Sequence, residues 1–515
     1  MVVVKRALLS CYDKTGLEAF AKTLVSLGVE LIASGGTAQQ LTCAGLPVTT
    51  VEAFAGITEQ LDGRVKTLHP KIHAGILARR DDPAHVSAVG ARGLIDLVAV
   101  NLYPFEQTIQ RAGVSLADAI EQIDVGGVAL LRAAAKNFSS VAALSRPEQY
   151  APVSRALTSE HGRIPEALAR SLAAQAFALT SAYDRVIADY LDAEPAEGRP
   201  AGERTVSVTM RHRQTLRYGE NPHQRAAWYV PVDGPRWGLG TLEQLRGKTL
   251  SYNNLLDLDA ACRCLMEFQP PTCVIVKHHA PCGVASADAA YQAYERAYAG
   301  DPESAFGGVV GFNRPLDAPL ARRLAETFLE VILAPAADPD AQALFAKKPQ
   351  VRLVTVTLPG SPPNGVEWRQ VSGAWLQQDA DIQTLDERAL KVVTKRAPGP
   401  REQVDGLFAW RIAKHALSNG IVLAAEQATV GIGQGQPSRV GSVRLAIQKA
   451  GARSRGAVAA SDGFFPFPDS VELLAQAGVR AIIQPGGSIR DAEVIAAADR
   501  CNVAMLMTGL RHFRH

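Results

Sequence analysis

The chain has 515 residues, of which 47% are hydrophobic and 20% charged, and its formal net charge is only +3. This length exceeds one ordinary hydrophobic core and indicates two or more domains, while so small a charge gives no indication of nucleic-acid binding. No stretch reaches the roughly 18 apolar residues of a membrane span, and the apolar run in MVVVKRALLS is too short for a secretory signal. Seven scattered cysteines without a C-x-x-C spacing predict no disulfide framework. We therefore expect a cytoplasmic globular protein that binds neither nucleic acid nor membrane.

Strands and helices alternate over the first 190 residues, which is typical of an α/β domain. Apolar runs predict strands, and Leu17, Phe20, Leu24 and Leu27 recur at helical spacing. The alternation predicts a parallel sheet whose ligands collect beyond the carboxyl ends of the strands. The predicted elements are strands at VVVKRALLS (2–10), VELIAS (29–34), LIDLVAVNLY (94–103) and SSVAALS (139–145), with helices at DKTGLEAFAKTLVSLG (13–28) and from TAQQ (37–40) onward.

A change of composition follows the first half. The segment LDAEPAEGRPAGERT (191–205) is rich in Pro, Gly and charge, so it predicts a linker with a boundary near 198. The expected domains are therefore 1–198 and 199–515. In the second, strands are predicted at PTCVIVKH (271–278), GGVVGF (307–312), EVILAP (330–335), ATVGIG (428–433) and VRAIIQP (479–485), and a helix at ADAAYQAYERAYAG (287–300).

Two segments of the first half suit an anionic ligand. Ser34-Gly35-Gly36-Thr37 lies where a strand ends and a helix begins, so free backbone N–H groups and the helix dipole favour a phosphate. A plain turn is the commoner use of a Gly-Gly pair. In DGRVKTLHP (62–70), Arg64 and Lys66 alternate with apolar residues, which indicates contact with an anionic substrate; a solvated charged loop is the alternative.

Asp124 precedes a predicted helix, and Lys136 lies near the end of that helix. From spacing alone, Asp124 is best explained as an N-terminal cap and Lys136 as a cation that offsets the helix dipole.

The segment VIVKHHAPCG (274–283) carries proton-transfer groups. We expect a buried strand to end at Lys277-His278-His279 and the chain to turn through Pro281-Cys282-Gly283. Lysine and histidine at a strand's carboxyl end suit acid–base chemistry, although a merely exposed strand end remains open. Zinc is the alternative for two histidines and a cysteine, but zinc deaminases use P-C-x-x-C and H-x-E, and neither is present.

Two segments near the C-terminus carry further candidate binding groups. GIGQGQPSR (431–439) is not a dinucleotide fingerprint, but it can approach a ligand closely, with Arg439 as an anion clamp at the next helix start. Phe464, Phe465 and Phe467 fit either core packing or stacking on a flat heterocycle.

In chain order these segments resemble one family, the bifunctional purine enzymes that join inosine monophosphate (IMP) cyclohydrolase to aminoimidazole carboxamide ribotide (AICAR) transformylase. The resemblance covers essentially the whole chain. Its landmarks are SGGT, DGRVKTLHP, NLYPF, EQIDVGG, LLRAAAKN, RYGENPHQ, VKHHAPCG, SAFGG, LSNGIVLA, GIGQGQPSR, SDGFFPFPDS and LRHFRH.

The resemblance implies a methylglyoxal-synthase-like parallel-sheet domain followed by a pair of cytidine-deaminase-like subdomains without a catalytic metal. It implies formyl transfer from the co-substrate 10-formyltetrahydrofolate to AICAR, and closure of formyl-AICAR to IMP with loss of water. The expected partners are these small molecules and a second copy of the chain, with transformylase sites at the homodimer interface.

The resemblance also implies roles for individual residues. The residues expected at the reacting atoms are Lys66, Tyr103, Asp124 and Lys136 in the cyclohydrolase, and Lys277 and the base His278 in the transformylase. Expected cyclohydrolase contacts are Ser10, Tyr12, Asp13, Lys14, Ser34, Gly35, Gly36, Thr37, Arg64, Val65, Thr67, Asn101 and Gly126. Expected transformylase contacts are Arg217, Tyr218, Gly307, Glu330, Asn419, Arg439, Phe464 and Arg511.

The chain departs from the family's bacterial pattern at Ala280, where an Asn is usual, so the contacts of that loop stay open. Two rival functions also stay open: a zinc-dependent deaminase, and a non-enzymatic sensor domain fused to a degenerate partner. The missing P-C-x-x-C speaks against the first, and the joint presence of Lys66, Lys136, Lys277 and His278 against the second.

Overall fold

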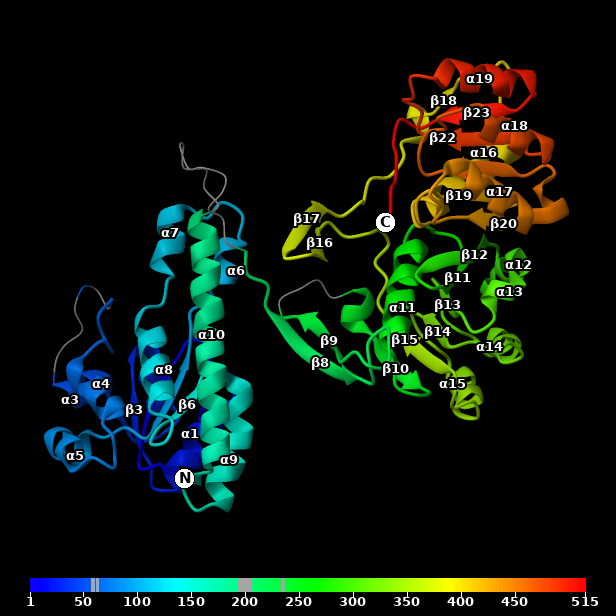
Figure 1. Ribbon diagram of the computed structural model, residues 1–515. Coiled ribbons are helices and arrows are strands. Elements are labelled where there is room, and N and C mark those ends of the chain that lie inside the picture. Colours follow the sequence, from blue (N-terminus) through cyan, green and yellow to red (C-terminus); the bar gives the residue numbers. More distant parts are fainter. Residues whose placement is uncertain (57–60, 62–63, 193–205, 233–236) are drawn as a thin grey trace. The chain divides into compact units, whose positions relative to one another are not determined.

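The computed structural model describes residues 1–56, 61, 64–192, 206–232 and 237–515. The chain divides into two compact units, Met1–Ser207 and Val208–His515 (Figure 1). The expected boundary near 198 and most of the expected linker lie outside the described residues. The first two linker positions, Leu191 and Asp192, instead end a long helix, α10 (Glu166–Asp192).

Within the described residues, the first unit contains a five-stranded parallel sheet in the order β4-β3-β2-β5-β6. From β2, the first strand of this sheet, the chain adds strands on one side as far as β4 and then returns to add β5 and β6 on the other side. Such a reversal of strand order creates a crevice for a ligand at the carboxyl ends of β2 and β5. The strands are β2 (Arg6–Cys11), β3 (Glu30–Ala33), β4 (Val48–Thr50), β5 (Leu97–Asn101) and β6 (Ala142–Leu144); the predicted strand 2–10 is split, because Val2–Val3 (β1) pairs separately with Arg163–Ile164 (β7).

Helices cover both faces of this sheet, and alternate residues of each strand enter different cores. Leu9 and Leu97 pack with helices α1 and α9 on one face, while Leu8 and Val98 pack with α4, α8 and α10 on the other. Such two-sided burial is typical of parallel sheets. The helices are α1 (Leu17–Ser26), α2 (Gly35–Cys43), α3 (Val51–Ala55), α4 (Pro70–Leu77), α5 (Pro83–Val89), α6 (Phe105–Ile109), α7 (Leu116–Glu121), α8 (Gly126–Lys136), α9 (Tyr150–Ser159) and α10.

Within the described residues, twelve strands of the second unit form one mixed sheet. Its order is β10-β15-β14-β13-β11-β12-β20-β19-β21-β22-β23-β18. These strands are β10 (Glu243–Arg246), β11 (Thr272–Lys277), β12 (Ala280–Ser286), β13 (Val309–Phe312), β14 (Val331–Ala334), β15 (Arg352–Thr355), β18 (Lys391–Val392), β19 (Ile421–Ala425), β20 (Ala428–Gly433), β21 (Val458–Ser461), β22 (Ala481–Gln484) and β23 (Ala504–Met507).

The sheet consists of two repeats of one motif, joined where β12 pairs with β20 (Figure 1). Each repeat runs helix, antiparallel hairpin, helix, and then three strands that are parallel to one another. Gly283 and Gly431 occupy matching strands, and a Cβ at either would lie 2.3 Å from a carbonyl oxygen of the following helix. The helices are α11 (Tyr252–Leu265), α12 (Ala290–Gly300), α13 (Pro302–Ala305), α14 (Ala318–Leu324) and α15 (Pro339–Ala346) in the first repeat, and α16 (Pro400–Ala413), α17 (Arg439–Ala450), α18 (Asp469–Gln476) and α19 (Asp491–Arg500) in the second.

One face of this sheet carries a core shared by both repeats, where α11 and α16 pack through residues such as Leu258 and Phe408. The other face has a separate core in each repeat. Two hairpins add to this frame, β8 (Met210–Leu216) with β9 (Ala226–Pro231), and β16 (Val366–Val371) with β17 (Ala374–Asp379). Among the described helices, none combines the length and the apolar composition that a bilayer span requires.

Candidate active sites

In the first unit, the expected polar residues gather at the carboxyl edge of the sheet, where β2 and β5 lie side by side. Asp13 follows β2, and its backbone N–H donates to Asn101 Oδ1 (2.8 Å) while Asn101 Nδ2 donates to the Asp13 carbonyl (2.7 Å). The hydroxyls of Ser10 and Ser34 lie 2.7 Å apart. Three strand ends are thus joined at the point where the chain order predicts a ligand.

The Gly-Gly turn forms the first turn of α2, which begins at Gly35 rather than at Thr37. Two ammonium groups lie close to this turn: a Cβ at Gly35 would be 3.8 Å from Lys66 Nζ, and one at Gly36 would be 3.9 Å from Lys14 Nζ. Two cations at a helix N-terminus form a strongly positive environment that favours a phosphate. The buried Thr37 hydroxyl bonds with the Cys11 backbone and fixes the turn to β2.

Asp124 lies two residues before α8 and is not its N-cap residue, which is Val125, although the Asp124 side chain does bond to the first turn of the helix. Its Oδ1 accepts from Gly127 N (2.7 Å), and its own N–H donates to the Tyr183 hydroxyl (2.8 Å). Burial raises the pKa of the Asp124 carboxyl and raises that of Tyr183 to about 12. A Cβ at Gly126 would lie 2.8 Å from Thr67 Oγ1, so the segment with Lys66 closely approaches the start of α8.

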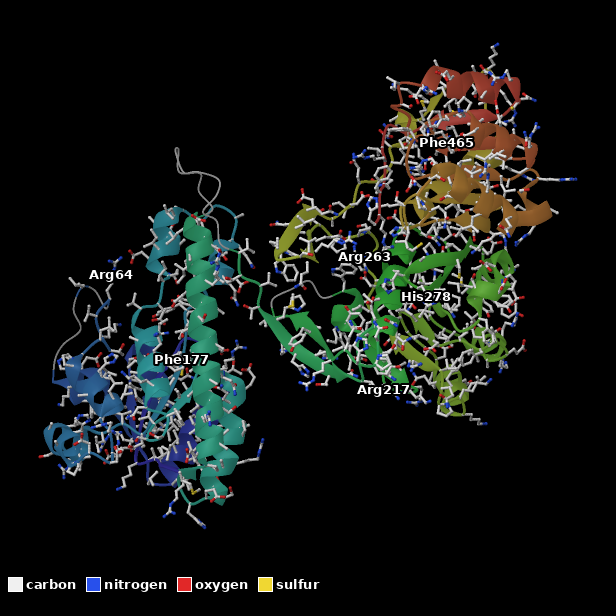
Figure 2. The ribbon with its side chains drawn as sticks, viewed as in Figure 1. Arg64, Phe177, Arg217, Arg263, His278 and Phe465 are labelled. Carbon is white, nitrogen blue, oxygen red and sulfur yellow. The ribbon has the colours of Figure 1, made fainter. Side chains whose placement is uncertain are left out.

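Aromatic and charged groups flank this edge. The exposed rings of Tyr12 and Tyr103 meet edge to face, with centroids 5.4 Å apart. Arg64, which is labelled in Figure 2, forms an ion pair with Glu121. Val65 is half-buried, and Asp62 and Gly63 lie outside the described residues.

Lys136 does not lie at this edge. It is the exposed last residue of α8, and at 1.5 Å per residue that helix carries it about 15 Å away from Gly126. The neighbouring Asn137 donates to the carbonyls of Ile76 and Ala78, at the far end of α4. The structure therefore brings together Lys66, Tyr103 and Asp124 but not Lys136, whose position agrees with the helix-dipole interpretation.

In the second unit, the predicted strand at 271–278 is confirmed, but the predicted turn through Pro281-Cys282-Gly283 is wrong. The turn is His278-His279, with φ of 54° and 64°, and Ala280 already begins β12. The register explains the difference, because Lys277 pairs with Ala280 across a two-residue hairpin. Ala280 is buried, so a larger side chain would have little space there.

This turn separates the three residues considered for zinc. Cys282 points into the protein, where its Sγ contacts the Ile275 carbonyl (3.5 Å), and burial raises the pKa of its thiol to about 12. His278 is exposed and precedes the strand. Among the described residues, no group of three or more His, Cys, Asp or Glu side chains is arranged to hold a metal ion.

Lys277 is fixed beside a glycine that leaves little room for a side chain. Its Nζ donates to the Phe306 carbonyl (2.7 Å). Gly307 has φ of 67°, and a Cβ there would lie 3.2 Å from Lys277 Nζ and 3.3 Å from the Phe328 ring. A glycine at position 307 therefore keeps the backbone close to the ammonium group.

Strand pairing carries another expected residue, Glu330, to the same sheet edge. Glu330 immediately precedes β14, and its Oε2 accepts from Asn254 Nδ2 (3.1 Å) and Arg352 (3.2 Å). Gln434 connects the repeats, because its Nε2 donates to the Pro281 carbonyl and its Oε1 accepts from Leu417 N.

Arg439 is not an open anion clamp. Its guanidinium is buried, where it pairs with Asp462, donates to Ser461 Oγ (2.8 Å) and donates to Asn419 Oδ1 (2.9 Å). Asn419 in turn donates to the Gln436 carbonyl (2.9 Å). Arg439 therefore holds Asn419 in place, and the expected ribotide contact of Arg439 stays a prediction.

A cavity of about 490 Å³ adjoins these residues, lined by Asn419, Arg439, Phe464, Phe467 and Phe513 among others. Phe464 and Phe467 line this cavity and are partly exposed, whereas Phe465 is fully buried. Core packing is thus confirmed for Phe465, and stacking of Phe464 on a flat heterocycle stays a prediction. The Arg511 guanidinium lies 4.8 Å from the Phe513 ring centroid, and the next residue, His512, bonds to the Asp462 carbonyl.

Arg217 and Tyr218 follow β8, and the Arg217 guanidinium lies 5.4 Å from the Tyr218 ring centroid. Figure 2 labels Arg217 and His278, which come from separate parts of the second unit. Among the residues that the structure describes, no interaction joins Arg217 or Tyr218 to the sheet edge, and the expected ribotide contacts of these two residues stay predictions.

Comparison with known families agrees with this arrangement of two units. Residues 16–129 match the MGS-like domain, and residues 134–449 match the family described as AICARFT/IMPCHase bienzyme. The chain belongs to the AICARFT/IMPCHase bienzyme family. It is therefore, by family, a bifunctional enzyme of purine biosynthesis, whose relatives in general use a formyltetrahydrofolate co-substrate.

A solved structure titled "Crystal structure of ForH" is 36% identical to this bienzyme chain. The match covers 37% of this chain and 99% of that one, with a TM-score of 0.35.

Several residues that contact the expected site residues or their neighbours were not predicted from the sequence. Asn254 on α11 and Arg352 on β15 bond to Glu330, and Tyr183 on α10 bonds to Asp124. Asp257 on α11 and Gln434 bond to His279 and Pro281, which lie next to expected site residues or in the same segment. The sequence offered one signal, because Ser251 and Asn254 form a capping box that predicts the start of α11. The other contacts join residues far apart in the chain.

Proposed function

We propose that this chain transfers a formyl group from 10-formyltetrahydrofolate to AICAR and then closes formyl-AICAR to IMP with loss of water. The two reactions use separate sites, the cyclohydrolase in domain 1–198 and the transformylase in domain 199–515. The observation that supports the proposal is that Lys14, Lys66 and Asp124 lie at one sheet edge of the first unit, and that Lys277, Gly307 and Glu330 lie at one sheet edge of the second.

At the first site, the ribotide phosphate binds the N-terminus of α2 between Lys14 and Lys66. The carboxamide nitrogen attacks the formyl carbon of the same molecule, so holding that geometry supplies much of the acceleration. Lys66 and the Tyr103 hydroxyl stabilise the oxygen anion that forms, and the Asp124 carboxyl moves the proton that leaves with water. The burial that raises the pKa of Asp124 suits this task.

At the second site, the amine of AICAR attacks the formyl carbon of the folate. His278 removes the amine's proton as the new C–N bond forms. The Lys277 ammonium, held beside Gly307, stabilises the charge that develops and protonates the departing folate nitrogen. Phe464 and the cavity next to Asn419 offer an aromatic surface for a flat ring.

The chain acts as a homodimer, with transformylase sites at the subunit interface. The β16–β17 hairpin supports this part of the proposal, because Trp375 and Leu376 are 61% and 58% exposed. Figure 1 shows this hairpin standing apart from the two repeats. Apolar side chains grouped on an exposed hairpin are typical of a protein contact surface.

The proposal is tested by following IMP formation from AICAR and 10-formyltetrahydrofolate with two variants. Lys66→Ala should accumulate formyl-AICAR, and His278→Ala should leave AICAR unconsumed. A mixture of the two variants should form IMP, because the intermediate diffuses from one protein to the other. Loss of both activities in either folded variant would contradict the two-site assignment.

A further inference from the structure

The two-residue turn that carries His278 has an unusual backbone. His278 and His279 both have positive φ, at 54° and 64°, a region that side-chain-bearing residues rarely adopt. Two-residue hairpins require this conformation, and Asn or Gly is the usual occupant. Since neither residue is of that type, the surrounding structure must hold the turn in place.

A carboxylate on α11 holds it. Asp257 Oδ1 accepts a hydrogen bond from the His279 backbone N–H at 2.7 Å. Asp257 is half-buried, and α11 is fixed by its capping box and by the shared core. A charge-assisted bond from a rigid helix restrains the backbone of the turn more strongly than a neutral bond would.

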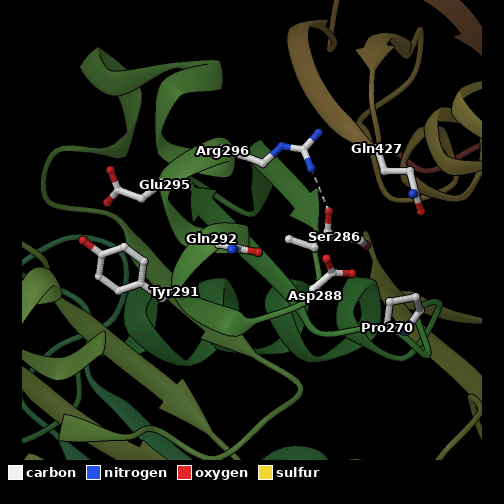
Figure 3. Close-up of a pocket in the computed structure, with 9 residues that line it drawn as sticks. Pro270, Ser286, Asp288, Tyr291, Gln292, Glu295, Arg296 and Gln427 are labelled. Carbon is white, nitrogen blue, oxygen red and sulfur yellow. Dashed lines mark hydrogen bonds between the residues drawn. The ribbon is translucent and has the colours of Figure 1, made fainter. Parts of the chain in front are cut away.

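The second repeat also has a left-handed hairpin turn held by an aspartate, but this turn lacks the lysine and histidine proposed for catalysis. Its hairpin turn is Glu426-Gln427, with φ of 53° and 58°, and Asp405 on α16 accepts from both backbone N–H groups at 2.9 and 2.7 Å. Gln427 of this turn lines the cavity shown in Figure 3, together with Arg296, which points toward Ser286. An aspartate that holds such a turn is thus part of the repeated fold, and only the first copy presents Lys277 and His278.

We propose that Asp257 is a positioning residue of the transformylase, which fixes the backbone from which the His278 side chain extends at the sheet edge. This inference rests on the proposed role of His278 as the base. Asp257 touches no substrate in this scheme and acts only through the turn.

The repeat supplies a matched control. Asp257→Ala and Asp405→Ala each remove a carboxylate that holds a hairpin turn, and Asp405 loses two bonds where Asp257 loses one. We expect Asp257→Ala to lower the kcat of formylation about 10- to 100-fold, because a displaced base loses its near-attack geometry, with little change in the KM for AICAR. Asp405→Ala should formylate normally, and both variants should cyclise formyl-AICAR at the wild-type rate.

Two further variants separate positioning from general destabilisation. Asp257→Asn keeps an oxygen acceptor for the His279 N–H and should recover most of the lost kcat. The double variant Asp257→Ala/His278→Ala should be no slower than His278→Ala alone, because a residue that acts through the base has no effect once the base is gone.

Equal kcat in Asp257→Ala and Asp405→Ala, or losses that multiply in the double variant, would overturn the positioning role and leave His278 as the base. Wild-type formylation by His278→Ala would instead overturn the proposed function itself.

Discussion

The two edges of the large sheet share one construction but differ in chemistry. At one edge, the hairpin turn His278-His279 follows Lys277 and lies beside Gly307. At the other, the turn Glu426-Gln427 follows Ala425 and adjoins the cavity of Figure 3. Both turns have left-handed backbones and an aspartate that holds them. The backbone geometry therefore belongs to the repeat, whereas the candidate site depends on a few side chains.

The two edges of the sheet in the first unit also differ in the residues that they carry. Lys66 and Asp124 lie at its carboxyl edge, near two helix N-termini, and Lys136 lies about 15 Å along α8. Helix dipoles make the carboxyl edge attractive to anions and the opposite edge attractive to cations. A lysine at the carboxyl edge can therefore bind an anionic ligand, whereas a lysine at the opposite edge stabilises the C-terminus of its helix.

The difference between the two edges of the large sheet is tested most directly by replacing one residue at the same position in each hairpin turn. His278→Ala should lower formylation by about 10² to 10⁴-fold, the usual worth of a general base, with cyclisation retained. Glu426→Ala, at the matching position of the other turn, should leave both activities unchanged. Separate assays of AICAR formylation and formyl-AICAR closure measure the difference, and similar losses in both variants would contradict it.

Asp124→Asn tests the carboxyl edge of the first unit. Cyclisation should fall about 10²-fold, because an amide moves no proton. Since burial raises the folded-state pKa of Asp124, its ionised form weakens the fold at neutral pH, so the variant should be no less stable than wild type there. Any stability gain should shrink as the pH falls through the raised pKa, where wild-type Asp124 becomes protonated. Urea unfolding at several pH values measures this, and a gain that grows on acidification would refute it.

Gly307→Ala tests whether close approach to Lys277 matters. The added Cβ would crowd Lys277 Nζ at 3.2 Å, and we expect formylation to fall about tenfold through lost geometry. Gly456→Ala is the matched control, because Gly456 also has positive φ (82°) but no atom lies within 4 Å of its Cβ position. Both variants should lose about 1–2 kcal/mol of unfolding free energy, because a residue with a Cβ is strained in the left-handed region, and only Gly307→Ala should lose activity.

The smallest effect is expected at the opposite edge of the first unit. Lys136→Ala should reduce the free energy of unfolding by about 0.3–1 kcal/mol, through the lost interaction with the α8 dipole, and leave cyclisation unchanged. Thermal unfolding and the closure assay measure the two quantities. A large loss of cyclisation would return Lys136 to the catalytic group.

The alternation of strands and helices was predictable because local patterns encode it. Leu17, Phe20 and Leu24 fall on the buried face of α1, as their spacing predicted. The turn near His278 was not predictable, since Pro281 and Gly283 are typical turn residues and the histidines are not. Pairing of β11 with β12 decided that turn, together with Asp257, which lies 22 residues away in the chain.

The sequence by itself determined the family, the α/β class and the residue types available for acid–base chemistry, because short motifs and hydrophobic periodicity are local properties. Only the tertiary structure decided which of those residues meet. In the folded chain, Lys14 and Lys66 lie at the N-terminus of one helix, and Lys136 lies far from both. Arg439 is buried, where it pairs with Asp462. Contacts of this kind join segments separated by tens of residues, and they form only when strand order and helix direction bring those segments to one edge of a sheet.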